Sequence, residues 1–181
     1  MTSILKVSEI QDPTNSNTAL TIDANGNVNI PGHVLQVKHT RYASEFVYSS
    51  GTSWVTFFTA TFTPKVANSH IYVDINTNIG RRTAGETQFG HRLQRNGTTL
   101  SAAQHLNTSL STNFDVFRSP DTANGNLHIF QSFSMVDDSH NTTSQITYTF
   151  QVASPNSGYP DMYFNFDGRS STYMKLTEIA Q

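Results

Sequence analysis

Apolar and polar residues alternate with period two along most of the chain between Val34 and Ile179. The alternation is clearest in segments 71–75, 127–135, 146–152 and 162–166, and no segment carries a convincing helical stripe. Successive side chains of a β-strand point to opposite faces, so this pattern predicts strands with one buried and one solvated face. Many such strands in series predict an antiparallel, all-β sandwich or barrel.

Turn residues separate the expected strands. Asn96-Gly97 is a hairpin signal, and segments 121–125 and 155–158 have the composition of loops. Eight or nine strands at this spacing favour a jelly-roll sandwich over an immunoglobulin-type sandwich, which often shows a Cys…Trp…Cys pattern. We expect strands at about 34–40, 53–63, 69–79, 87–95, 112–118, 126–137, 144–153, 161–167 and 172–179.

The first 32 residues differ from the rest of the chain. Leu20 and Ile22 alternate before Asn25-Gly26, Val28 and Ile30 alternate after it, and Pro31-Gly32 then breaks the pattern. This order predicts a β-hairpin, which is marginally stable when isolated in water. We therefore interpret residues 1–32 as an attachment stalk and residues 33–181 as the jelly-roll domain.

The composition excludes several classes of protein. The formal net charge is −2 and charged residues make up 13% of the chain, so the basic surface of a nucleic-acid-binding protein is not expected. The absence of cysteine excludes disulfides and thiolate chemistry, and favours assembly in a reducing cytoplasm. The N-terminus lacks the pattern of a signal peptide, and no run is long and apolar enough for membrane insertion.

Four stretches, taken in order, resemble the C-terminal domain of a group of phage tail-fibre and virion structural proteins. They are ALTIDANGNVNIPGHVLQVKHTRY, TATFTPKVANSHIYVDINTNIG, HRLQRNGTTL and STYMKLTEIAQ, and together they extend over most of residues 18–181. The resemblance implies a jelly roll similar to tumour-necrosis-factor and complement-C1q domains, which form trimers. It also implies a place in a bacteriophage virion, at a fibre tip or as a surface appendage, and it supplies no catalytic residues.

No catalytic or metal-binding motif stands out in the sequence. The 7 histidines show no HxH or HExxH spacing, and no GxSxG motif frames a serine. We therefore expect no enzymatic activity, no metal site and no cofactor. One alternative stays open, in which His39 and His91 point toward a trimer axis and hold a metal ion there.

A dense aromatic cluster marks the segment 53–63. Trp54, Phe57 and Phe58 lie close together there, and adjacent positions of a regular strand cannot face the same core. One face of this strand is therefore expected to pack against a neighbouring protomer, because obligate interfaces are apolar. These three residues are the predicted trimer interface.

A second group of aromatic and polar residues lies near the C-terminal strands. Tyr159, Tyr163 and Tyr173 lie there beside Asn165 and Arg169. Sugar binding uses an aromatic face together with a few fixed polar groups, so these five residues are the predicted contact site for a host-surface glycan or protein. Tyrosines that only fill the rims of strands are the competing interpretation.

The sequence supports two hypotheses about function. The first is a non-enzymatic virion component, a trimeric fibre tip or adhesin that is joined to other virion proteins through its N-terminal segment and binds the host surface by avidity. The second is a purely structural trimerisation cap or capsid decoration without a ligand. Both hypotheses place the protein in a virion.

Overall fold

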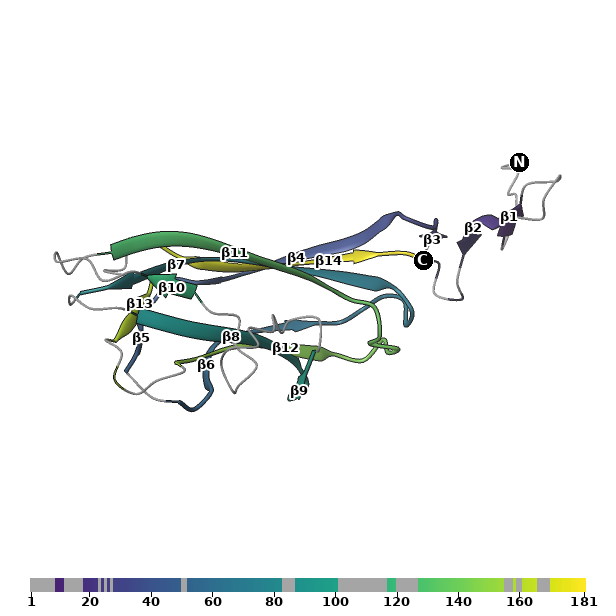
Figure 1. Cartoon of the computed structure of the whole chain (residues 1–181). Coiled ribbons are helices and arrows are strands. Elements are labelled where there is room, and N and C mark those ends of the chain that lie inside the picture. The colour runs from purple at the N-terminus through teal and green to yellow at the C-terminus, as the bar shows by residue number, and fades with distance from the viewer. Residues whose placement is uncertain are drawn as a thin grey trace.

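The period-two pattern forms antiparallel strands throughout the computed structural model, and the part of the chain that it describes contains no helix (Figure 1). The described residues are 9–11, 18–22, 24, 26, 28–49, 52–82, 87–100, 117–119, 127–154, 158, 161–165 and 170–181.

The first sheet is organised around its longest strand. It contains β4 (Val34–Tyr42), β5 (Phe46–Tyr48), β7 (His70–Arg81), β11 (Leu127–Asp137), β13 (Met162–Phe164) and β14 (Thr172–Ile179). Strand β11 pairs along one edge of β7, while β14 and β13 follow each other along the opposite edge. Strands β4 and β5 then pair with β14 and β13.

The second sheet lies face to face with the first (Figure 1). It contains β6 (Val55–Phe62), β8 (Thr87–Arg95), β9 (Thr98–Thr99), β10 (Phe117–Ser119) and β12 (Ile146–Ala153), in the order β10-β8-β12-β6, with β9 paired to β8. The chain crosses from one sheet to the other between β5 and β6, β6 and β7, β7 and β8, β10 and β11, β11 and β12, and β12 and β13. This connectivity is that of a jelly roll, so the predicted fold class is confirmed.

A separate three-stranded sheet precedes the sandwich. It consists of β1 (Glu9–Gln11), β2 (Thr18–Ile22) and β3 (Val28–Asn29), and it projects beyond the end of the sandwich at which the C-terminus lies (Figure 1). The predicted hairpin is present, because Ile22 pairs with Val28 and Gly26 has a φ of 81°. At the junction, the Gly32 amide donates to the Ala180 carbonyl at 2.8 Å. The function of this sheet as an attachment stalk stays a prediction.

Alternate residues of both sheets meet in one core. Ile71, Val73 and Ile75 of β7 are buried on one side, and Tyr148 and Phe150 of β12 are buried on the other. The residues between them on each strand are more exposed, as the alternation predicts. Most of the stabilisation of the sandwich therefore comes from the apolar area that these inward faces remove from water.

A β-bulge changes the interpretation of the aromatic strand β6. Phe58 pairs with Phe150, but the next pair along joins Thr56 to Gln151, so β12 has no residue opposite Phe57. The extra residue allows two consecutive side chains to face inward. Phe57 and Phe58 are both buried in the core, at 4% and 5% exposure, with ring centroids 6.4 Å apart.

The expectation that Phe57 and Phe58 form a subunit interface is therefore corrected. Both rings are covered within a single chain, where Phe57 also packs 4.5 Å from Phe164. Strand β6 does not require another protomer against one of its faces, because the bulge accounts for the two inward rings. Trp54 is half-buried just before β6 and takes part in a different arrangement, described below.

Candidate functional site

The two outer faces of the sandwich differ in their chemistry. The outer face of the second sheet carries hydroxyl and amide side chains and one charged group among its described residues. Strand pairing places Thr59 beside Thr149, and Thr149 beside Gln94. We name this surface the threonine face, and its residues are Thr56, Thr59, Thr61, Arg92, Gln94, Thr147, Thr149 and Gln151.

Arg92 is the charged group of the threonine face, and two neighbours fix its position. Its Nε donates to Oε1 of Gln151 at 2.7 Å, and Gln151 donates through Nε2 to Oγ1 of Thr56 at 3.1 Å. The guanidinium lies 4.5 Å from the centre of the Trp54 ring. Burial lowers the pKa of Arg92. This row of side chains holds a planar cation in a defined orientation at the surface.

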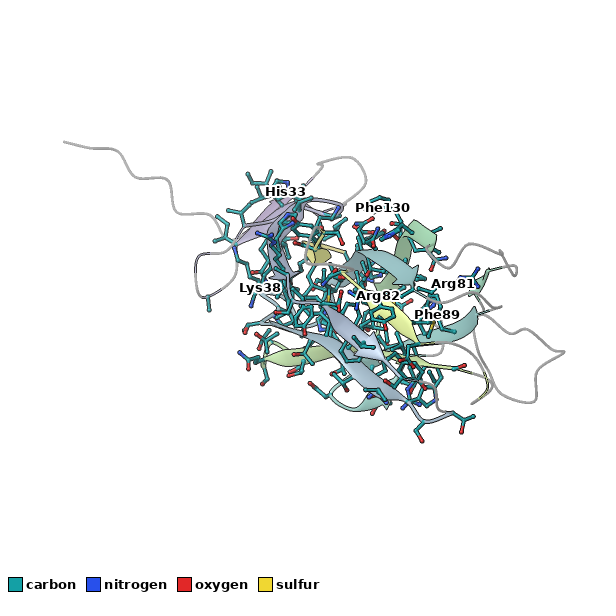
Figure 2. The ribbon with its side chains drawn as sticks, turned by 90° about the vertical axis from the view of Figure 1, so that its left-hand side faces the viewer. His33, Lys38, Arg81, Arg82, Phe89 and Phe130 are labelled. Carbon is teal, nitrogen blue, oxygen red and sulfur yellow. The ribbon has the colours of Figure 1, made fainter. Side chains whose placement is uncertain are left out.

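The outer face of the first sheet carries exposed large apolar side chains interspersed with polar and charged ones. Phe130 of the edge strand β11 is 83% exposed, and Figure 2 places it at the periphery of the ribbon. Val37, Tyr72, Val136 and Tyr173 are exposed on the same face. We name this surface the apolar face. It has the chemical character of a surface that another protein covers.

A depression of about 560 Å³ lies within the apolar face. Its lining residues are His39, Asp74, Asn76, Ser132, Tyr173 and Lys175. Lys175 Nζ lies 2.9 Å from Oδ2 of Asp74, and the Ser134 hydroxyl donates to Oδ1 at 2.6 Å. Burial opposes ionisation of Asp74, but the bonds from Lys175 and Ser134 outweigh it and lower the pKa. Asp74 and Lys175 therefore line the depression as an ion pair in which the two charges neutralise each other.

The structure does not bring together those predicted contact residues that it describes. Tyr159 and Arg169 lie outside the described residues. Tyr163 lies near one end of the sandwich with the Arg82 guanidinium 4.4 Å from its ring centre, whereas Tyr173 lines the depression on the apolar face. The prediction of one shared site for the described members of this group is therefore not supported by their positions.

Asn165 is a structural residue and not a contact residue. It is completely buried, has a φ of 56°, and donates through Nδ2 to the carbonyl oxygens of Tyr42 and Ser44 at 2.9 and 3.0 Å. Its Oδ1 accepts from the Thr172 hydroxyl at 2.9 Å. These bonds hold the bend between β4 and β5 against the bend between β13 and β14. The prediction that Asn165 binds a ligand is corrected, because no part of its side chain reaches solvent.

One grouping of Ser, His and Glu exists within the described residues, but its hydrogen bonds are not those of a catalytic triad. The Ser69 hydroxyl donates to Glu178 Oε1 at 2.7 Å and also lies 3.2 Å from His140 Nε2. A nucleophilic serine would give its proton to the histidine, whereas Ser69 gives it to the carboxylate. All three side chains are buried. The grouping therefore stabilises the turn before β7.

The two histidines proposed for a trimer axis lie on different layers. His39 is exposed beside the depression, whereas His91 is 7% exposed with its ring 3.9 Å from that of Phe133. His91 therefore lies inside one protomer, and the alternative in which both point to an axis is wrong. Within the described residues, no group of three or more His, Asp or Glu side chains is placed to hold a metal ion.

Comparisons with known proteins give a distant structural likeness. No protein-family model and no curated protein matches the sequence. The solved structures that are similar include "Structure of infectious bursal disease virus Gx strain", at 13% identity, and "Crystal structure of infectious bursal disease virus VP2 subviral particle", at 14% identity, each with a TM-score of 0.41. Each match covers 98% of this chain and 42% of the other chain. With identity and TM-score this low, the likeness carries no argument about function.

The described part of the chain contains no helix with the length and hydropathy that crossing a membrane requires.

Proposed function

We propose that this protein is a non-enzymatic structural component of a virus particle, a jelly-roll module that associates with copies of itself through the apolar face. The observation that carries the proposal is the exposure of Val37, Tyr72, Phe130, Val136 and Tyr173 on one outer face, while the opposite face carries threonine and glutamine. The virion location rests on the resemblance of most of residues 18–181, except segment 100–125, to phage tail-fibre and virion structural proteins.

The size of the apolar face suits a subunit interface. Strand β7 has 12 residues, so four strands about 4.8 Å apart and about 40 Å long present roughly 600 Å². With its rims, this area approaches the roughly 800 Å² that each partner buries in a standard interface. The Lys175–Asp74 pair neutralises the centre of the face. A second copy of the chain can therefore cover the centre of the face without leaving Lys175 or Asp74 as a lone buried charge.

The shape of the face supports a heterologous contact between copies. Phe130 projects from the edge strand, and the depression lined by Tyr173, Asn76 and Ser132 lies on the same face. In such a contact Phe130 of one subunit would meet the depression of the next, and head-to-tail contacts of this kind form a ring when the rotation between subunits closes and an open filament when it does not. A ring of three subunits is the assembly that we propose, with the threonine face directed outward and residues 1–32 joined to other virion proteins.

Sedimentation velocity of the full chain, at several micromolar concentrations, tests this assembly. We expect three times the chain mass of 20.1 kDa for the parent protein and a monomer for Phe130→Asp. The side chain of Phe130 is mostly exposed, so this variant is expected to fold. Thr149→Asp, on the threonine face, is the matched control and should keep the trimer. A monomeric parent, or a trimer that survives Phe130→Asp, would contradict the proposal.

Immunogold electron microscopy of particles from the virus that encodes the chain tests the location. Labelling at fibre tips or on the particle surface is the expected result. Labelling of infected cells without labelling of purified particles would overturn the virion role.

A second candidate function is adhesion to a host surface. The arrangement of Arg92 on the threonine face favours it, because this face stays open to solvent when the apolar face is covered.

A further inference from the structure

The Arg92 platform, which consists of Trp54, Thr56, Arg92 and Gln151, has the geometry of an anion receptor. A guanidinium carries five N–H donors. Nε is used by Gln151, and no acceptor among the described residues lies at the terminal nitrogens Nη1 and Nη2. The Trp54 ring supports the guanidinium at 4.5 Å. The orientation of the free donors is therefore set before any ligand arrives, which lowers the entropy lost on binding.

Arg92 shares with Arg41 the lack of a carboxylate partner, which separates these two arginines from the paired cations of the described residues. Arg82, Arg95 and Lys175 each lie within 3.0 Å of a carboxylate. Arg92 has no carboxylate partner among the described residues, although burial lowers its pKa and so opposes its charge. A partly desolvated cation without a counter-ion gains more from an incoming anion than a cation that is already paired.

The surroundings of Arg92 indicate the class of anion. Thr56, Thr59, Thr149 and Gln94 offer hydroxyl and amide groups at the spacing of neighbouring strands, about 4.8 Å. A nucleic acid would require several cations along a groove, whereas the described part of this face holds one. A planar carboxylate accepts two parallel bonds from the fork of an arginine, and the hydroxyl groups of a sugar ring can bond to the threonines and amides.

We propose that the Arg92 platform binds the carboxylate of an acidic sugar, a uronic acid unit within a surface polysaccharide. Nη1 and Nη2 of Arg92 donate to the carboxylate, and Gln151 holds Nε so that both face outward. Thr56, Thr149 and Gln94 bond to hydroxyl groups of the same or the adjacent sugar. This site specifies the ligand class for the second candidate function and does not depend on whether the apolar face forms a trimer.

Isothermal titration of the full chain with an oligogalacturonate of defined length tests the site. A neutral maltooligosaccharide of equal length serves as the comparison ligand. We expect the parent to prefer the oligogalacturonate and Arg92→Gln to lose at least about tenfold in affinity for it. Arg92→Lys should bind with intermediate affinity, since an ammonium group keeps the charge but loses the planar fork and its stacking on Trp54.

The matched control is Arg41→Gln. Arg41 lies on the apolar face, and its Nε donates to the Ser171 hydroxyl at 2.9 Å, so it is a second arginine without a carboxylate among the described residues. Arg41→Gln should bind the oligogalacturonate as the parent does. Equal losses in Arg41→Gln and Arg92→Gln would show nonspecific attraction to charge and would overturn the site.

Two further results would overturn the proposal. One is the absence of oligogalacturonate binding by the parent at millimolar concentration. The other is equal or tighter binding of an oligoglutamate peptide, which would indicate an acidic peptide as the partner. Circular dichroism and sedimentation of each variant separate a loss of fold or assembly from a loss of the site, because the expected Arg92 variants keep the mass and melting temperature of the parent.

Discussion

The phenolic hydroxyl of Tyr148 donates a hydrogen bond of 2.7 Å to Oδ2 of Asp137, whose other oxygen lies 2.5 Å from Nη1 of Arg95. The three residues belong to β12, β11 and β8, so this network joins the two sheets at one end of the sandwich. Burial, together with the Asp137 carboxylate, raises the pKa of Tyr148. The phenol therefore stays protonated and remains a donor well into the alkaline range.

Replacing Tyr148 with Phe should destabilise the fold by about 1–3 kcal/mol, because the buried carboxylate of Asp137 loses one of its donors. Asp137→Ala should cost more, about 3–5 kcal/mol, since it breaks a partly buried ion pair and leaves the Arg95 charge without its partner. Urea denaturation at one fixed protein concentration measures both effects. A Tyr148→Phe variant as stable as the parent would show that the hydrogen bond contributes nothing to stability.

Glu178 is a buried carboxylate surrounded by hydrogen-bond donors. Its oxygens accept from the backbone amides of Lys65 and Val66 at 2.9 to 3.0 Å, from the Ser69 hydroxyl at 2.7 Å and from Gln36 Nε2 at 2.6 Å. A glutamine in this place must direct its own N–H groups at one of those donors.

Glu178→Gln is therefore expected to lower the free energy of unfolding by about 2–3 kcal/mol, because at least one buried donor is left without an acceptor. Glu45→Gln is the matched control. The Glu45 carboxylate lies 3.0 Å from the more exposed Arg82, so its loss should change stability by less than about 1 kcal/mol. Equal effects in the two variants, measured by thermal unfolding, would argue against a structural role for the Glu178 network.

The sequence predicts the long strands of this fold well. In β7, β11, β12 and β14, one buried face imposes alternation along most of the strand, with exceptions such as Gln131 in β11, so the strand and its inward side can be predicted from the sequence. The turn at Asn96-Gly97 was also predictable, because both residues adopt positive φ angles, 48° and 83°, that few residue types tolerate. The jelly-roll class follows from the number and spacing of such strands.

The bulge at Phe57 and the short strands could not be predicted in the same way. A bulge depends on the register between β6 and β12, which are far apart in the sequence, and the interpretation of Phe57 and Phe58 as an interface was wrong for that reason. Strands β5 and β9 contain three and two residues, too few to show a period. Their positions are set by pairing with longer neighbours.

The candidate site could be predicted from the sequence even less well than these short elements. Trp54 stands out as the single tryptophan, but its pairing with Arg92 requires β6, β12 and β8 to lie side by side. Tyr173 is exposed and its role as a contact residue stays a prediction, whereas Asn165 is buried and its side chain bonds to three partners, Tyr42, Ser44 and Thr172. Polar residues near strand ends can face solvent or hold a bend, and composition does not distinguish these two roles.

The acid stability of the protein should depend on Asp74. Its pKa is lowered in the folded state, because the bonds from Lys175 and Ser134 outweigh burial. The unfolded state then binds more protons than the folded state at low pH, so stability falls as the pH drops. The contribution of Asp74 is complete above the unfolded pKa of about 4 and is lost as the pH falls through the lower folded pKa.

Melting temperatures measured from pH 7 to pH 2 on the parent and on Asp74→Asn test this dependence. We expect the parent to lose more stability than the variant below about pH 4 and the difference to shrink in high salt, because the pair with Lys175 is partly exposed. Parallel curves for the two proteins over the whole range would exclude a contribution from this pair.

Two hydrogen bonds at the junction between the N-terminal sheet and the sandwich predict how the melting temperature changes when the chain is shortened. The Gly32 amide donates to the Ala180 carbonyl at 2.8 Å, and the Ala180 amide donates to the His33 carbonyl at 2.9 Å. A chain that begins at Pro31 keeps both bonds, and we expect its melting temperature to stay within about 3 °C of the parent. A chain that begins at Val34 loses both bonds and should melt roughly 2–12 °C lower, at about 0.5–1.5 kcal/mol for each bond. Differential scanning calorimetry distinguishes the two. Loss of cooperative unfolding in the chain that begins at Pro31 would show that residues 1–30 belong to the folded core and are not an attachment segment.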